Sequence, residues 1–363
     1  MTHRMNRGDF LQPDEVVEPH TPNFLHPRQS DSPNDRLAFA RWLVDRRSPT
    51  TARALVNRVW QAYFGIGLVE TAEDLGSQAP PPSHPELLDW LAVEFMERGW
   101  SLKHLHRLIT SSAAYRQRSH HRGRPAQVDQ YNRLVWRGPR GRVESEVVRD
   151  IALAASGLLD RRTGGHSVYP PAPRFLFAPP ASYGLKVWKT RQDASSFRRS
   201  LYVQAYRSVQ YPPLQVFDAP PGNAACVRRT RSTTPLQALT LLNEEQFVAA
   251  ARALASRRMK LGVDADLARV EHAYEMLMTR RPDAEEGATL VEFLNDCRKG
   301  LASGEIDAFA VTGQKEGAAD PAAARELAAW TLTARRLLNL DETITKPWRI
   351  PADATPHWRA IRG

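Results

Sequence analysis

Apolar residues recur at helical spacing along most of this chain. Leu55, Val59 and Tyr63 fall on one helical face directly after the turn at Ser48-Pro49-Thr50. The same periodicity predicts helices over residues 51–64, 144–159, 234–258, 267–279, 283–299 and 321–340, with shorter ones beginning near residues 34, 83 and 101. This pattern is typical of a mainly α-helical protein.

Residues 163–232 interrupt the helical pattern. They are rich in Gly, Pro, Ser and aromatic residues, and Ser200 to Tyr206 is the best strand candidate, with a partner near Val168 or Val187. Long irregular stretches in compact proteins are usually functional or cover another surface. The predicted fold class is therefore mainly α: a multi-helix, bundle-like domain with a small β element and a long irregular insertion in the middle.

Two helix starts carry recognisable capping residues. In Thr233-Thr234-Pro235 either threonine can cap the helix, and Pro235 suits its first turn. Ser83 followed by Glu86 has the spelling of a capping box, which predicts Ser83 as the N-cap. These signals predict local structure and carry no chemistry.

The net charge of +10 raises the question of nucleic-acid binding, because Lys and Arg neutralise phosphates. However, only seven of the 50 basic residues are Lys, and the arginines are scattered along the chain. An Arg-rich, Lys-poor composition is also what GC-rich coding gives. Nucleic-acid binding is therefore disfavoured.

The sequence carries no signal for membrane spanning or for a bound cofactor. No apolar run approaches the roughly 20 residues of a membrane helix, and the first ten residues lack the apolar core of a signal peptide. The two cysteines, Cys226 and Cys297, are too few for a zinc cluster, and no Cys-x-x-Cys-His sequence occurs for c-type haem. We therefore expect no membrane span, no metal and no cofactor in this chain.

Several phrases of the sequence resemble one known family. In chain order they include Asn57-Arg58-Val59-Trp60, His84-Pro85-Glu86-Leu87, Gly99-Trp100-Ser101-Leu102, Phe217-Asp218-Ala219-Pro220 and the stretch from Thr233 to Asn243. On these phrases the chain is identified as a member of the family called domain of unknown function 1553. The resemblance extends over about residues 35–342.

The resemblance implies a division of the chain. We expect residues 1–34 to be a linker to an upstream domain, residues 35–342 to be the family's helical domain, and residues 343–363 to be a disordered tail. Within the helical domain, an N-terminal half (35–162) and a C-terminal half (233–342) flank the irregular segment (163–232).

The resemblance also implies a setting. In the family this domain usually lies at the C-terminus of an exported, planctomycete-type protein, after a cytochrome c-type domain and a companion domain of unknown function 1549. The haem would then be held upstream, the location would be periplasmic or at the cell surface, and the system is associated with polysaccharide. Since this chain begins without a signal peptide, we expect a detached C-terminal part, which would be cytoplasmic if it is a full-length product.

Three polar residues in the first half are candidates for chemistry. Arg58, beside Asn57, could bind a ligand's carboxylate or sulfate in bidentate fashion, or it could pair with Asp89 or Glu94 and brace two helices. His84 could act as a general base or metal ligand, or it could belong to a helix cap.

A second candidate site lies in the irregular segment. Asp218 could be a catalytic carboxylate or a calcium ligand, or it could be an ordinary turn residue before Ala219-Pro220. Arg229 and Arg231 follow closely in sequence and would keep Asp218 ionised if they lie near it. We expect Asp218 with Arg229 or Arg231 to form the polar site.

Three functions compete. There is no Gly-x-Ser-x-Gly sequence, phosphate loop, His-Glu-x-x-His sequence or dinucleotide fingerprint. The favoured function is a binding or interaction module in a cytochrome-linked, polysaccharide-related system. The alternatives are a hydrolase or oxidoreductase acting on glycans around Asp218, and a basic nucleic-acid-binding protein.

Overall fold

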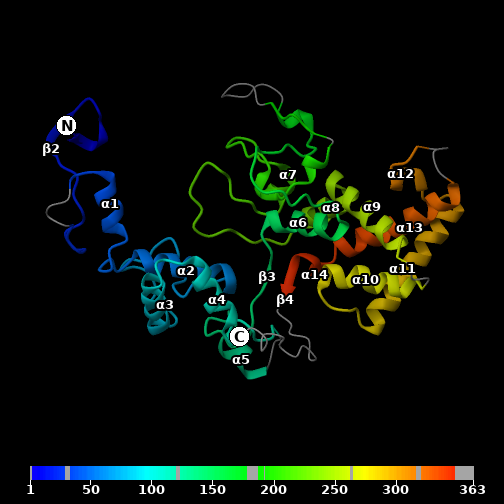
Figure 1. Ribbon diagram of the computed structural model, residues 1–363, viewed down its shortest axis with the longest axis horizontal. Helices are drawn as coiled ribbons and strands as arrows, with labels where there is room; N and C mark the ends of the chain where they lie inside the picture. The colour runs from blue at the N-terminus through cyan, green and yellow to red at the C-terminus, as the bar shows by residue number, and fades with distance from the viewer. Residues whose placement is uncertain are drawn as a thin grey trace. The chain divides into compact units, whose positions relative to one another are not determined.

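Helices dominate the protein, as the sequence predicted. The computed structural model describes residues 2–28, 33–119, 123–177, 187–191, 193–261, 265–315 and 320–347. The chain forms two compact units, residues 1–139 and residues 140–363 (Figure 1). Each of the two sheets found in the described ranges has only two strands. No helix among these residues is long and apolar enough to cross a membrane.

The first unit begins with a β-hairpin where the sequence predicted an extended linker. Strand β1 (Thr2–Met5) pairs antiparallel with β2 (Pro13–Val17), with Thr2 opposite Val17. Pro13 stands at the start of its strand, where a missing backbone N–H does not interrupt the ladder. The prolines of this segment therefore exclude a helix but allow a hairpin.

Five helices lie in the described part of the first unit, and three of them share an apolar core. The five are α1 (Arg36–Leu43), α2 (Thr51–Phe64), α3 (Pro85–Glu97), α4 (Leu102–Ser111) and α5 (Gly123–Val128). Helices α2, α3 and α4 supply most of the buried side chains, including Val56, Trp60, Leu91, Phe95 and Leu105. The α4 start follows the sequence prediction, since the Ser101 side chain accepts from the His104 amide.

The second unit is a larger helical assembly. Its main helices are α6 (Ser145–Ser156), α8 (Pro235–Asn243), α9 (Glu245–Met259), α10 (Asp266–Met278), α11 (Ala284–Ser303), α12 (Ala308–Thr312) and α13 (Pro321–Leu338). Helix α13 packs against α9, α11 and α12. Small buried residues such as Ala250, Ala251, Ala328 and Ala329 line α9 and α13 and let the two backbones approach closely.

The irregular segment contains short turns in place of the predicted strand. It holds η2 (Arg174–Phe177), η3 (Ala194–Phe197), η4 (Ser200–Tyr202) and α7 (Pro212–Val216). Val203 meets Val168, one of the two expected partners, in a single isolated bridge. The strand prediction was wrong because the Ser200 amide donates to the Asp150 carboxylate at 2.7 Å, which takes it out of any ladder.

The tail predicted to be disordered begins with ordered structure. Residues of this part form α14 (Asp341–Ile344) and β4 (Thr345–Pro347), and β4 pairs antiparallel with β3 (Arg140–Arg142). Residues 348–363 lie outside the described residues. The prediction of disorder from residue 343 was therefore wrong for residues 343–347.

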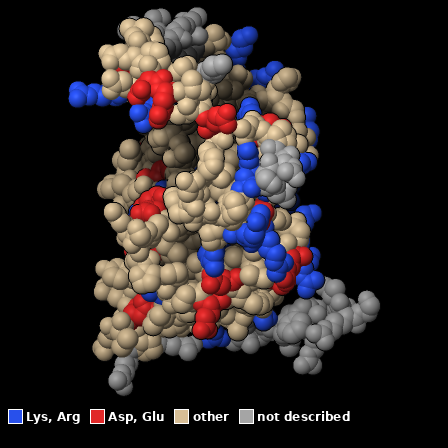
Figure 2. Space-filling view, turned by 90° about the vertical axis from the view of Figure 1, so that its left-hand side faces the viewer, with Lys and Arg blue, Asp and Glu red and all other residues tan. Residues whose placement is uncertain are grey.

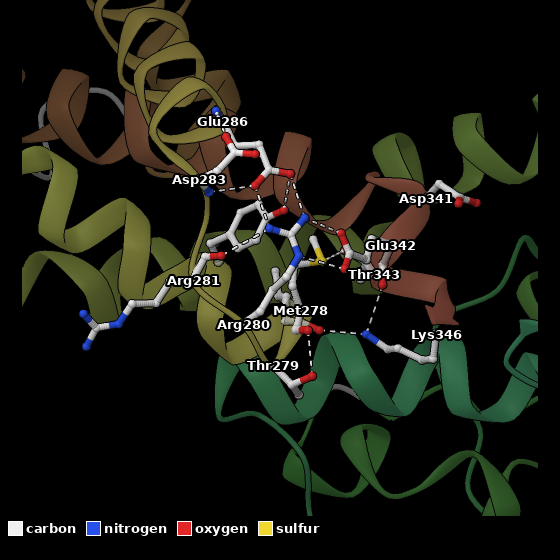
Figure 3. Close-up of polar contacts among 12 residues, drawn as sticks. Met278, Thr279, Arg280, Arg281, Asp283, Glu286, Asp341, Glu342, Thr343 and Lys346 are labelled. Atoms are coloured by element: carbon white, nitrogen blue, oxygen red, sulfur yellow. Dashed lines mark hydrogen bonds and ion pairs between the residues drawn. The ribbon is translucent and has the colours of Figure 1, made fainter. Parts of the chain in front are cut away.

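An ion-pair cluster holds this C-terminal structure. Arg280 donates to both carboxylate oxygens of Glu286 and of Glu342, at 2.6–2.9 Å, and so joins α11 to α14 (Figure 3). Lys346 Nζ donates to the carbonyls of Leu277 and Glu342, at 2.7 and 3.1 Å. The hydrogen bonds from Arg280 lower the pKa of Glu286 from 4.5 to about 2.

This cluster gives the second unit a testable pH dependence. Because the folded pKa of Glu286 is depressed, its contribution to stability is full above pH 4.5 and is lost as the pH falls toward 2. We expect Glu286→Gln to lower the free energy of unfolding by about 1–2 kcal/mol at pH 7. Urea unfolding should show that the difference in free energy of unfolding between wild type and Glu286→Gln becomes smaller below pH 4.5. Glu285→Gln, at an exposed site in the same helical turn, is the matched control. A difference in free energy of unfolding that is the same at every pH would contradict the claim that Glu286 stabilises the fold in its ionised form.

Candidate functional site

Asn57 is a structural clamp in the first unit. It is buried in α2, where its Oδ1 accepts from the Val69 amide at 2.9 Å and its Nδ2 donates to the Val69 carbonyl at 3.0 Å. A Cβ at Gly67 would lie 2.7 Å from the Asn57 amide group, so the loop can approach only because residue 67 is Gly. Both polar atoms of the buried Asn57 amide are hydrogen-bonded to the loop, so this side chain serves the fold.

Arg58 points to solvent, and neither of its two expected partners is available. Asp89 pairs with Arg53 at 2.6 Å, and Glu94 pairs with Arg98 and with His104. Among the described residues Arg58 has no ion-pair partner, and it is exposed. The expected brace between helices through Arg58 was therefore wrong, and the Asn57-Arg58 pair combines one structural and one surface residue.

His84 is the N-cap residue of α3, one position later than the sequence predicted for the cap. Its Nδ1 lies 3.0 Å from Ser83 Oγ, and neither side chain caps the helix. The capping-box prediction for Ser83 was wrong because Pro85 occupies the first helical position and so fixes the start of the helix. His84 is half-buried in the first unit, whereas Asp218 belongs to the second.

Asp218 forms an ion pair, but its partner is Arg142 on β3. Arg142 Nη2 donates to Asp218 Oδ2 at 2.5 Å, and Asp218 also accepts from the Ser232 amide and hydroxyl at 2.8–2.9 Å. Burial opposes ionisation, but the hydrogen bonds from Ser232 and the charge of Arg142 outweigh it and lower the pKa of Asp218. Asp218 has a φ of +62°, in the left-handed region that Asp tolerates in turns.

Arg229 and Arg231 bind other carboxylates. Arg229 Nη1 lies 3.1 Å from Glu144 and 2.7 Å from Glu146, and Arg231 Nη2 lies 3.1 Å from Glu144. These contacts attach the segment before α8 to the start of α6. The expected pairing of Asp218 with Arg229 or Arg231 was therefore wrong.

A polar pocket lies in the irregular segment, away from these candidates. It has a volume of about 640 Å³, in the range of small-molecule sites. It is lined by residues 162–168 and 193–195 together with Arg191 and Arg198. The lining residues therefore include three arginines, one histidine and two serines beside one acidic residue, Asp193.

Arg198 shapes the wall of this pocket. Its guanidinium donates to the carbonyls of Arg162, Gly164 and His166 at 2.5–3.1 Å, and its Cζ lies 3.8 Å from the centre of the Tyr202 ring. The Tyr202 hydroxyl in turn accepts from the Gly164 amide at 2.8 Å. A loop with no regular structure is thus wound around one buried cation.

A second buried cation, Arg149, attaches this region to the helices. Arg149 is only 2 % exposed on α6, and its guanidinium donates at 2.6–3.1 Å to the carbonyls of Ser196 and Arg198, to Ser200 Oγ and to Gln246 Oε1. Gln246 itself donates to the Ser196 carbonyl at 3.0 Å. The pocket wall is therefore hydrogen-bonded to both α6 and α9.

This arrangement suits binding through hydrogen bonds. Asp218 already accepts several donors and is held ionised, so it is poorly placed to abstract a proton. The pocket instead offers exposed polar groups on a fixed frame. Two sequence signals, the Gly164-Gly165 pair and the Arg198-Arg199 pair, mark the loop and its anchor, but their contact cannot be seen in the sequence.

Comparisons with known proteins agree with the phrases seen in the sequence. The model of the family PSD1, Protein of unknown function (DUF1553), matches residues 35–294, a range that includes all the candidate residues above and the pocket. No curated protein and no solved structure matches the chain.

Asn57 is buried and Arg58 is exposed, so substitutions of these two neighbours test whether Asn57 holds the loop at Val69. We expect Asn57→Ala to lower the free energy of unfolding by about 2–3 kcal/mol, because it leaves a buried backbone amide and carbonyl of Val69 unpaired. Arg58→Ala, the adjacent exposed change, should alter it by no more than about 0.5 kcal/mol. Urea unfolding measures both values. Equal effects of the two variants would contradict the assignment of Asn57 as the clamp.

Proposed function

The chain belongs to the PSD1 family, Protein of unknown function (DUF1553), and from this premise we propose that it is a binding module of an exported, polysaccharide-related protein. The single observation that carries the proposal is the polar pocket of the second unit. The export and the polysaccharide setting are inferred from the family resemblance. In that setting a separate upstream domain would hold the haem, since this chain has no Cys-x-x-Cys-His sequence.

The pocket supports a hydroxyl-rich ligand. Its lining residues offer guanidinium, imidazole, hydroxyl and backbone amide groups beside apolar surface from residues such as Val168 and Ala194. Saccharides are recognised by such groups, because each ring presents several hydroxyls that both donate and accept. The frame built by Arg149 and Arg198 keeps these groups in place before binding, which reduces the entropy lost on association.

The distribution of charge favours this function over nucleic-acid binding. Many arginines of the described residues are paired with carboxylates, among them Arg46, Arg53, Arg133, Arg142, Arg162, Arg229, Arg231, Arg280 and Arg298. On the face shown in Figure 2, basic and acidic side chains are interspersed. A nucleic-acid backbone is instead bound by a continuous basic stripe or patch.

A thermal-shift screen with oligosaccharides tests the proposal. A ligand present at about 100 times its Kd should stabilise the folded chain by about 2.7 kcal/mol and raise the melting temperature by several degrees. Ser167→Trp, which places a large ring on an exposed lining position, should abolish the shift. Ser208→Trp, at an exposed position that does not line the pocket, should retain it. A cooperative melt that no saccharide shifts would contradict the proposal.

A further inference from the structure

The cations of the pocket differ in whether they are free to bind a ligand. The Arg198 guanidinium already donates hydrogen bonds to three backbone carbonyls. Arg162 donates to both oxygens of Asp160 at 2.6–3.1 Å, so its charge is already neutralised. These two arginines therefore build the pocket and are not its free binding groups.

Arg191 is the most loosely paired of the three arginines that line the pocket. Its side chain is 64 % exposed and lies 3.8 Å from Asp193, which is beyond hydrogen-bonding distance. Its backbone is fixed, since its amide donates to the Tyr169 carbonyl at 3.2 Å. Asp193 in turn is engaged by the amide and hydroxyl of Ser195. Arg191 thus presents a guanidinium that has a loose ion pair with Asp193 and no side-chain hydrogen bond within the described residues.

The loop around Arg198 adds unused amide donors. In a trans peptide the C=O and the following N–H point in opposite directions. Because the carbonyls of residues 162, 164 and 166 turn toward Arg198, the amides of Thr163, Gly165 and Ser167 turn away from it. Within the described ranges, none of these three amides donates a hydrogen bond. Gly164 and Gly165, at φ +77° and +83°, allow the loop to take this shape.

These observations point to one ligand class. Unused amides and a loosely paired guanidinium are groups that bind oxyanions, and backbone amides in left-handed turns form anion sites elsewhere. We propose that Arg191, with the exposed His166 and the amides of this loop, forms a subsite for an anionic substituent, a sulfate ester or a carboxylate, on a saccharide. The inference rests on the proposed saccharide-binding function and specifies its substrate class.

Isothermal titration of the whole chain tests this subsite. The probes are a sulfated oligosaccharide, its desulfated counterpart and a uronic-acid oligosaccharide of equal length. We expect at least one charged probe to bind tenfold more tightly than the neutral one, and added salt to reduce the difference. Arg191→Gln should remove the preference. Arg281→Gln, the control, changes another exposed arginine outside the pocket and should keep it.

Each outcome separates this inference from the proposal on which it rests. A preference for only one charged probe supports the subsite and identifies its substituent. Equal affinity for charged and neutral probes overturns the subsite and leaves saccharide binding intact, as does a preference that survives in Arg191→Gln. A preference lost equally in Arg281→Gln reflects the net charge of the chain and also overturns the subsite. If no probe binds to the folded chain, both the subsite and the proposed function fail.

Discussion

The guanidinium of Arg149 donates to two buried backbone carbonyls of the irregular segment, those of Ser196 and Arg198, and Gln246 shares the first of them. Buried carbonyls need donors, and Ser196 and Arg198 have no β-ladder to supply them. A planar cation with five N–H groups can serve several carbonyls from one position. Arg198 acts in the same way nearer the pocket, where its guanidinium donates to the carbonyls of residues 162, 164 and 166. Hydrogen bonds therefore connect α6 to the pocket: Arg149 holds the backbone of Arg198, and the side chain of Arg198 holds the loop that lines the pocket.

The helices could be predicted from the sequence because periodic burial is a local signal. Residues 51–64 form α2 with the predicted bounds. The helix predicted over residues 234–258 is instead two, because the Glu244 side chain accepts from the amides of Gln246 and Phe247 and starts α9 afresh. The strand predicted at Ser200–Tyr206 failed for a related reason: β propensity does not reveal that Asp150 and Arg149 will take its hydrogen-bonding groups.

The candidate site could be predicted only in part, because ion pairing follows the fold and not proximity in sequence. Arg229 and Arg231 lie closer to Asp218 along the chain than Arg142 does, yet Arg142 reaches it from β3. Most of the polar residues that the sequence singled out hold the structure together: Asn57 clamps a loop, and Asp218 joins a turn to a strand. The loosely paired Arg191 and the loop amides that have no acceptor within the described residues belong to no recognisable motif. They are found only once the partners of their neighbours are known.

The measurement that tests this account most directly is hydrogen exchange on Arg149→Met beside Arg199→Met. Arg199 is half-exposed and adjacent to the same network, so it controls for loss of charge. Arg149→Met should speed exchange of the protected amides at Val168, Ser196 and Val203, abolish ligand binding at the pocket, and leave α11 and α13 protected. Arg199→Met should change neither the exchange rates of these amides nor ligand binding at the pocket. Unchanged protection at these amides in Arg149→Met would contradict the claim that one buried cation holds the pocket in place.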